Sequence, residues 1–143
     1  TDVFVVGADG MILHYDGTEW STMASGTTQT LWAVWGTSPT DVYAVGDFSF
    51  AAGAALHYDG TEWTPVPGLP SSLYADLYDI WGSPSAGVFA VGVAGIILHY
   101  DEATDWEIMT TPVDVGLESI CGSATGIDVY VFGENGTILH YGN

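Results

Sequence analysis

The chain has 143 residues, 48% of them hydrophobic, which is enough apolar material to bury the core of one domain and argues against disorder. It contains 18 aspartate and glutamate residues and no lysine or arginine, so its formal net charge is −18. Because no lysine or arginine can neutralise phosphates, we expect neither nucleic acids nor anionic membrane surfaces as partners.

The N-terminal unit is predicted to contain three short strands. Residues 3–7 (Val-Phe-Val-Val-Gly) and 12–15 (Ile-Leu-His-Tyr) are rich in strand-forming residues, and a further strand begins near Trp20. Asp16-Gly17 lies between the last two strands and is a typical hairpin turn. No stretch of the chain has convincing helical periodicity, so we expect an all-β fold.

Two sequence segments of this unit, which we call phrases, recur three times along the chain, and each later unit begins with an additional strand. That additional strand is predicted at residues 31–36, 77–82 and 117–122. The phrase of residues 2–7 returns at residues 41–46, 87–92 and 128–133, and the phrase of residues 12–15 returns at residues 55–58, 97–100 and 138–141. The strand that begins near Trp20 returns near Trp63 and Trp106 but not in the fourth unit.

The length of the repeat indicates a β-propeller. The histidines of the four units, His14, His57, His99 and His140, lie 43, 42 and 41 residues apart. A period of about 40–45 residues with four strands per unit is typical of propeller blades. We therefore predict one repeat domain, residues 1–143, with about 3.5 blades of antiparallel strands. Its complete blades are residues 31–65 and 77–109, flanked by blade remnants at residues 1–30 and 117–143.

The units resemble the tandem propeller repeats of the YCF48-like and Asp-box (BNR-like) type. The resemblance rests on Val3 to Gly7, on Gly10 to Leu13 and on Asp16-Gly17-Thr18-Glu19-Trp20. By this resemblance, residues 31–36 and their two copies would form the innermost strands, and the strands at the repeated tryptophans the outermost. The Asp-box of that type is a folding device in a turn, so the resemblance implies no catalytic role for it.

The predicted strands leave the ring of blades unfinished. The first remnant lacks its inner strand, the last lacks its outer strand, and a propeller needs at least about four blades. Two chains would supply about 28 strands, the number in a ring of about seven blades. Because natural proteins avoid open strand edges, we expect a homodimer or another self-association through these edges. A fragment of a longer propeller protein is the alternative.

Candidate contact residues lie where the units differ. The second unit carries an insertion at residues 48–53, with Phe48 and Phe50, and the segment before the third unit is long and contains Tyr74. Both segments are expected on the same face of the propeller. These three aromatic residues would form an apolar patch there, and such patches tend to mark contacts with a partner.

A second candidate set lies on the inner strands. Trp32, Tyr78 and Glu118 occupy the same position in the three copies of the inner strand but differ in residue type. Positions that stay alike build the scaffold, whereas positions that differ are free to carry a specific surface. We therefore expect these residues to line a central pocket.

Several other residues are predicted to be structural. The four histidines lie one per unit on strands far from the axis, so they cannot converge on one metal ion and are expected to form hydrogen bonds within the scaffold. Asp2, Asp41 and Asp128 open the repeated phrase and are expected to cap turns by accepting backbone N–H groups. Cys121 replaces the tryptophan of the other inner strands and is expected to be a buried apolar residue.

No catalytic motif is visible, and we expect the chain not to be an enzyme. It contains neither a nucleophile elbow nor a phosphate-binding loop. Asp-box propellers include sialidases, which hold the substrate carboxylate with arginines, and this chain has none. We also expect neither a cofactor nor a metal. The predicted function is a self-associating scaffold or interaction module that binds a protein ligand, with a secreted, glycan-binding (lectin-like) propeller as the alternative.

Overall fold

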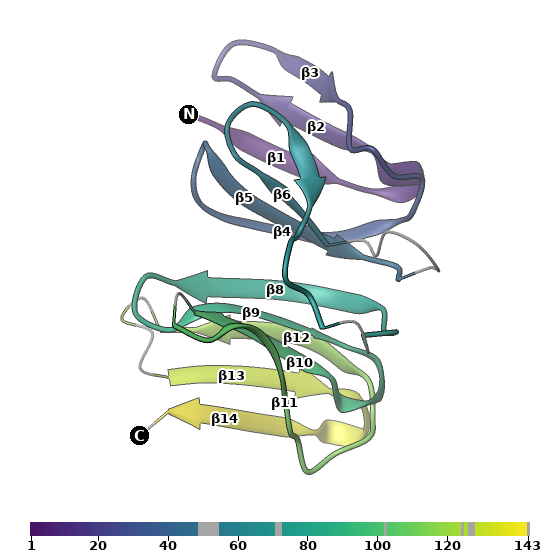
Figure 1. The fold of residues 1–143 in the computed structure, drawn as a ribbon, viewed down its shortest axis with the longest axis vertical. Coiled ribbons are helices and arrows are strands. Elements are labelled where there is room, and N and C mark those ends of the chain that lie inside the picture. Colours follow the sequence, from purple (N-terminus) through teal and green to yellow (C-terminus); the bar gives the residue numbers. More distant parts are fainter. Residues whose placement is uncertain (49–54, 71–72, 102, 124, 126–127, 143) are drawn as a thin grey trace.

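The computed structural model consists of four antiparallel sheets, which follow one another along the chain (Figure 1). It describes residues 1–48, 55–70, 73–101, 103–123, 125 and 128–142. We call the sheets blades 1 to 4 in chain order. In Figure 1 blade 1 lies at the top, blade 4 at the bottom, and blades 2 and 3 between them. No helix in the described part of the chain is long and apolar enough to cross a membrane.

The described residues contain 14 strands, and strands that are consecutive in sequence pair within each blade. Blade 1 contains β1 (Val3–Val6), β2 (Ile12–Tyr15) and β3 (Trp20–Met23). Blade 2 contains β4 (Leu31–Ser38), β5 (Asp41–Gly46), β6 (Ala55–Tyr58) and β7 (Trp63–Pro65). Blade 3 contains β8 (Leu77–Ser83), β9 (Gly87–Gly92), β10 (Ile97–Asp101) and β11 (Asp105–Met109). Blade 4 contains β12 (Leu117–Gly122), β13 (Asp128–Gly133) and β14 (Ile138–Gly142).

Three short 3₁₀ turns join consecutive strands: η1 (Ala8–Gly10) joins β1 to β2, η2 (Val93–Gly95) joins β9 to β10, and η3 (Glu134–Gly136) joins β13 to β14. Each turn carries two consecutive residues with positive φ, the second of which is a glycine. At Gly95 the glycine is required twice, because φ is +73° and a Cβ atom would lie 2.1 Å from the carbonyl oxygen of Val113. Gly95 therefore allows η2 to lie against the segment that leads into blade 4.

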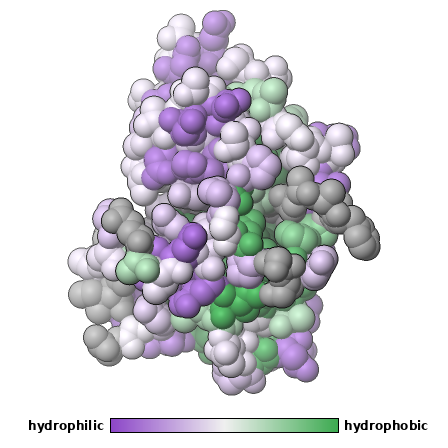
Figure 2. Space-filling view, in the orientation of Figure 1, coloured by the Kyte–Doolittle hydropathy of each residue, from purple (hydrophilic) through white to green (hydrophobic). Residues whose placement is uncertain are grey.

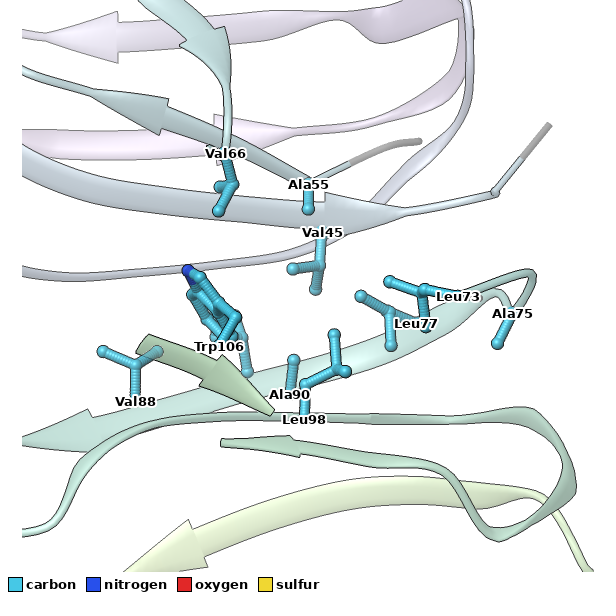
Figure 3. Close-up of a cluster of buried hydrophobic side chains, with 11 residues drawn as sticks. Val45, Ala55, Val66, Leu73, Ala75, Leu77, Val88, Ala90, Leu98 and Trp106 are labelled. Atoms are coloured by element: carbon cyan, nitrogen blue, oxygen red, sulfur yellow. The ribbon is translucent and has the colours of Figure 1, made fainter. Parts of the chain in front are cut away.

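The hydrophobic core consists of three layers, one between each pair of consecutive blades. The layer between blades 1 and 2 contains Ile12 and Val42, and the layer between blades 3 and 4 contains Val91 and Val129. The middle layer is shown in Figure 3, where side chains of blades 2 and 3 fill the space between the sheets. Because each layer needs two blades, blades 2 and 3 are apolar on both faces, and their strands lack a polar alternation.

The structure confirms the predicted fold class. The chain is all-β, its sheets have three or four antiparallel strands, and they form an unclosed, partial propeller. Among the described residues, no strand pairs with the open edge of β1 in blade 1 or with the open edge of β14 in blade 4, so each of these blades has three strands. The two incomplete blades are the two ends of the stack (Figure 1).

Candidate functional site: the end faces and the inner-strand surface

Every blade has two faces, which the repeat makes easy to assign. In β5, Val42 and Ala44 pack against blade 1, whereas Tyr43 and Val45 pack against blade 3. We call the side that points to the lower-numbered blade the preceding face and the other side the following face. In blades 2 and 3 both faces are covered by a neighbouring blade. Among the sheets that the structure describes, none lies on the preceding face of blade 1 or on the following face of blade 4.

The preceding face of blade 1 is an exposed apolar surface. Trp20 is 52% exposed, although the tryptophans at the same repeat position, Trp63 and Trp106, are only 6% and 9% exposed. Val3 and Val5, which occupy the repeat positions of the buried residues of β5 that face blade 1, are exposed as well. The first end of the stack therefore shows the residues that elsewhere fill a core layer.

The following face of blade 4 shows the same contrast. Ile138 is 63% exposed, whereas Ile12 and Ile97 at the same repeat position are 1% and 8% exposed. Tyr130 and Phe132 on β13 are also exposed, although the equivalent residues of β9 are buried between blades 3 and 4. We call these two surfaces the blade 1 end face (Val3, Val5, Trp20) and the blade 4 end face (Tyr130, Phe132, Ile138).

One aromatic contact recurs across the blade boundaries. The ring of Phe4 in blade 1 lies 5.8 Å from Tyr58 and 6.1 Å from Trp63 in blade 2. The same position in the next two blades makes the same kind of contact. The ring centroids of Tyr43 and Trp106 are 6.2 Å apart, and those of Phe89 and Tyr141 are 5.4 Å apart. Such pairs add about 0.5–1.5 kcal/mol beyond their buried area, so the contact helps fix how blades stack.

A second contact also recurs between inner strands. The ring of Trp35 in blade 2 lies over Gly82 of blade 3, and the ring of Trp81 lies over Gly122 of blade 4. Cys121 occupies this tryptophan position in blade 4 and is exposed, because no further blade covers it. The prediction of a buried cysteine was wrong for this reason.

The three variable inner-strand residues occupy one bulge, repeated in three blades. Leu31 pairs with Gly46 and Ala33 with Val45, so Trp32 has no partner on β5. The pairing of β8 with β9 skips Tyr78 in the same way, and that of β12 with β13 skips Glu118. A bulge re-aims the side chain of its extra residue, which explains why this position varies while its neighbours do not.

The structure brings these three residues into one acidic and aromatic region, the inner-strand surface. Trp32 is half exposed, and its indole N–H donates a hydrogen bond of 2.7 Å to Asp47. Burial and the negative charges of four carboxylates raise the pKa of Tyr78 above its usual value. Those carboxylates are Asp76, Glu134, Asp47 and Glu118. That Trp32, Tyr78 and Glu118 line a central pocket and contact a ligand stays a prediction.

The predicted aromatic patch is present in part. The rings of Phe48 and Tyr74 lie 6.1 Å apart in an edge-on contact, and Tyr74 is largely exposed. The backbone N–H of Phe48 donates to the carboxylate of Asp76, which ties this pair to the inner-strand surface. Phe50 lies outside the described residues. The role of these residues as contacts for a partner stays a prediction.

The histidines form hydrogen bonds within their own blades. The imidazoles of His14, His57 and His140 donate to Asp2, Asp41 and Asp128 over 2.9, 2.8 and 2.9 Å. In blade 3 a glycine replaces the aspartate, and the imidazole of His99 lies 2.8 Å from the carbonyl oxygen of Ala86. The aspartates are therefore partners of histidines, and the prediction that they cap turns is corrected.

A different set of aspartates caps the hairpin turns between the third and fourth strands. The carboxylates of Asp16, Asp59 and Asp101 each accept two backbone N–H groups. These hydrogen bonds lower the pKa of all three carboxyl groups. Among the described residues, no group of three or more His, Cys, Asp or Glu side chains is placed to hold a metal ion.

A cleft of about 1050 Å³ lies beside the hairpins of blades 2 to 4. Trp35, Tyr43, His99 and Tyr141 contribute to its walls. These rings pack mostly on one another or on neighbouring rings, and burial followed by the charge of Asp41 raises the pKa of Tyr43 to about 12. Of these four rings Tyr141, which is 48% exposed, offers a ligand most of the free stacking surface, and we do not take the cleft as the candidate site.

Figure 2 shows the mixed character of the outer surface, with hydrophilic residues over the upper part and apolar side chains gathered in the lower centre. Sequence reasoning predicted open ends but named none of the end-face residues as functional candidates. The signal that could have found them is the phase of the repeat. None of the described sheets lies on the preceding face of blade 1, and the alternate residues Val3 and Val5 of its first strand are exposed.

The fold and the two open end faces define the class of this protein: it is a partial β-propeller. A solved structure described as "YCF48 bound to D1 peptide" is similar to it, with a TM-score of 0.58 and 15% sequence identity. The match covers 97% of this chain and 50% of that chain, so this chain spans about half the length of the YCF48 chain. At this identity the likeness shows the fold alone. Neither a family model nor a curated protein matches the sequence.

Proposed function

We propose that this chain is a non-enzymatic interaction module, built from YCF48-like or Asp-box-like repeats, that works as an assembly of copies of itself. The observation that supports this proposal is the exposure of apolar core positions at both ends of the stack, led by Trp20 and Ile138. Removing apolar surface from water is favourable by about 25 cal/mol per Å², and the freedom that two copies lose when they associate offsets part of this gain. Large exposed apolar patches on a protein surface mark contacts with partners.

Charge opposes this association. Each copy carries a net charge of −18, and no lysine or arginine is present to bridge two copies. Salt screens repulsion between exposed charges, with a Debye length of about 10 Å at an ionic strength of about 0.1 M and about 3 Å at about 1 M. The apolar contact gains strength as salt is added, because the repulsion fades while the burial of apolar surface remains.

The first prediction is therefore a salt-dependent assembly, which analytical ultracentrifugation measures. At an ionic strength of about 0.5 M we expect a mass of at least twice the 15.1 kDa of one chain, and at about 0.01 M a shift toward 15.1 kDa. The variant Ile108→Asp is the control, because Ile108 is 41% exposed but lies on β11, away from both end faces. A chain that stays at 15.1 kDa at every salt concentration contradicts the proposal.

Two other readings compete with self-association. Further blades of a longer propeller chain would cover the same end faces, and in that case these faces are complementary to those blades and association of the 143-residue chain substitutes for them. Ligand binding at the inner-strand surface is the other reading. The YCF48 structure is described as bound to a peptide, and the half-exposed ring of Trp32 is suited to stacking on a sugar ring.

The second prediction concerns this ligand-binding alternative. If the module binds glycans, an array of immobilised glycans retains the chain, and Trp32→Ala reduces binding at least about tenfold, which corresponds to about 1.4 kcal/mol of lost stacking. Ile108→Ala serves as the control, since it changes an exposed side chain outside the inner-strand surface. Absence of binding on a broad array, or equal losses for both variants, rejects the lectin alternative.

A further inference from the structure

The two end faces differ in a way that determines how copies meet. The blade 1 end face consists of residues at preceding-face positions, and the blade 4 end face consists of residues at following-face positions. At each of the three internal boundaries, a following face packs against a preceding face. One chain therefore carries both halves of the contact that it already uses three times within itself.

We infer that copies associate head-to-tail, with the blade 4 end face of one copy packed on the blade 1 end face of the next. This inference rests on the proposed self-association and adds its geometry. Contacts between two blade 1 end faces, or between two blade 4 end faces, have no counterpart at the internal boundaries. The head-to-tail contact has the same arrangement of faces as the three boundaries between blades within one chain.

The aromatic contact that recurs between blades indicates which residues meet in the head-to-tail contact between copies. At the internal boundaries the aromatic residue of the following face meets the tyrosine or tryptophan of the preceding face in the next blade. In blade 4 that following-face residue is Tyr130, which is stacked on His140 of its own blade and is exposed. In blade 1 the receiving pair is Tyr15 and Trp20, with ring centroids 5.3 Å apart. Tyr130 of one copy therefore packs on Tyr15 and Trp20 of the next.

A head-to-tail contact either closes into a ring or continues as a filament, according to the rotation between copies. Two copies joined by two such contacts form the smallest ring, and the described residues of each copy contribute four sheets. Stacked in this way, two chains provide twice four sheets, which is eight. Propellers of about four to eight blades are common. The ring would then contain eight sheets, four of them three-stranded, and not the seven complete blades that the strand count suggests.

The test uses two variants that each block one end. Trp20→Asp places a charge in the blade 1 end face, and Phe132→Asp places one in the blade 4 end face. Both residues are exposed on strands, so we expect both variants to fold, with far-ultraviolet circular dichroism as the check. Val5→Asp and Ile138→Asp are the second pair, should either variant unfold. Ile108→Asp controls for the added charge.

Masses are measured by analytical ultracentrifugation for the wild type, for each variant and for an equimolar mixture. We expect each blocked variant alone to fall to 15.1 kDa, because its one intact face finds only blocked partners. In the mixture, the intact blade 4 end face of Trp20→Asp meets the intact blade 1 end face of Phe132→Asp. The mixture should therefore recover twice the mass of one chain, at higher concentration than the wild type because one contact replaces two.

The outcomes separate the two proposals. A wild type that is monomeric at all salt concentrations overturns self-association and the head-to-tail contact with it. A wild type that associates, while one blocked variant still dimerises alone, overturns only the head-to-tail contact and indicates that like faces meet. Two monomeric variants that do not associate when mixed, even at high concentration and salt, also overturn it.

Discussion

A Gly92→Ala variant is expected to lose about 3 kcal/mol or more of its free energy of unfolding, beyond the usual cost of an oversized core residue. A Cβ atom at Gly92 would lie 1.8 Å from the carbonyl oxygen of Asp76 and 3.0 Å from the Cα atom of Leu77. That carbonyl accepts the N–H of Val93, and Leu77 is paired with Gly92 where β8 meets β9. Backbone atoms cannot rotate away, so the inner strand of blade 3 must move.

The backbone angles of Gly92 add nothing to this cost, because its φ of −169° is ordinary extended backbone. Gly7 is the matched control, since it holds the same repeat position in blade 1. A Cβ atom there meets only the terminal methyl group of Met11, at 2.9 Å, because blade 1 has no inner strand. We expect Gly7→Ala to cost less than about 1 kcal/mol in urea unfolding. Similar losses for the two variants would show that the inner strand is not the cause.

Most of the fold could be predicted from the sequence, because the repeat fixes it several times over. The phrase of residues 128–133 copies that of residues 41–46, and both form the second strand of a unit, β13 and β5. Because the neighbouring strands also recur at the same spacing, each strand is expected to pair with the same neighbours in every unit. The phase of the repeat also shows that blade 1 lacks its first strand and blade 4 its last. Fold class and strand order therefore follow from local pattern alone.

The candidate site could be predicted only in part, because exposure depends on what lies beyond a blade. Phe89 and Tyr130 hold one repeat position, and nothing in their own phrases indicates that the first is buried and the second exposed. Cys121 was predicted to be buried by analogy with Trp81, but the analogy fails at the end of the stack. The bulge that groups Trp32 with Tyr78 is equally invisible in sequence, since it is a property of the pairing.

The partnership of histidine and aspartate shows the same limit in a different form. Asp2 and His14 are twelve residues apart, yet antiparallel pairing of β1 and β2 places their side chains 2.9 Å apart. The repetition of both residues in the other phrases was visible, but their contact was not. In a chain without lysine or arginine, an imidazole is the side-chain partner that Asp2, Asp41 and Asp128 have in common, and Asp41 also accepts a hydrogen bond from the Thr37 hydroxyl.

The matched pair Phe89→Ala and Tyr130→Ala tests whether the two positions really differ only in coverage. Phe89 is 2% exposed, stacks on His99 at 4.3 Å and packs against Tyr141 of blade 4. Its truncation leaves a cavity between two blades, for which about 3–5 kcal/mol is the typical loss. Tyr130 makes the equivalent stack on His140 but is 41% exposed, so in a dilute, low-salt monomer we expect a loss of only about 1 kcal/mol.

When association is measured in place of unfolding, Tyr130→Ala is expected to have the larger effect of the two variants. Tyr130→Ala removes the ring that we place against the next copy, so its association should weaken at least about tenfold, the equivalent of about 1.4 kcal/mol. Urea unfolding of the monomer gives one quantity and sedimentation gives the other. A Tyr130→Ala chain that associates as tightly as the wild type would mean that this ring is not at the junction. A loss of about 3–5 kcal/mol in its monomer would mean that the blade 4 end face is already covered within one chain.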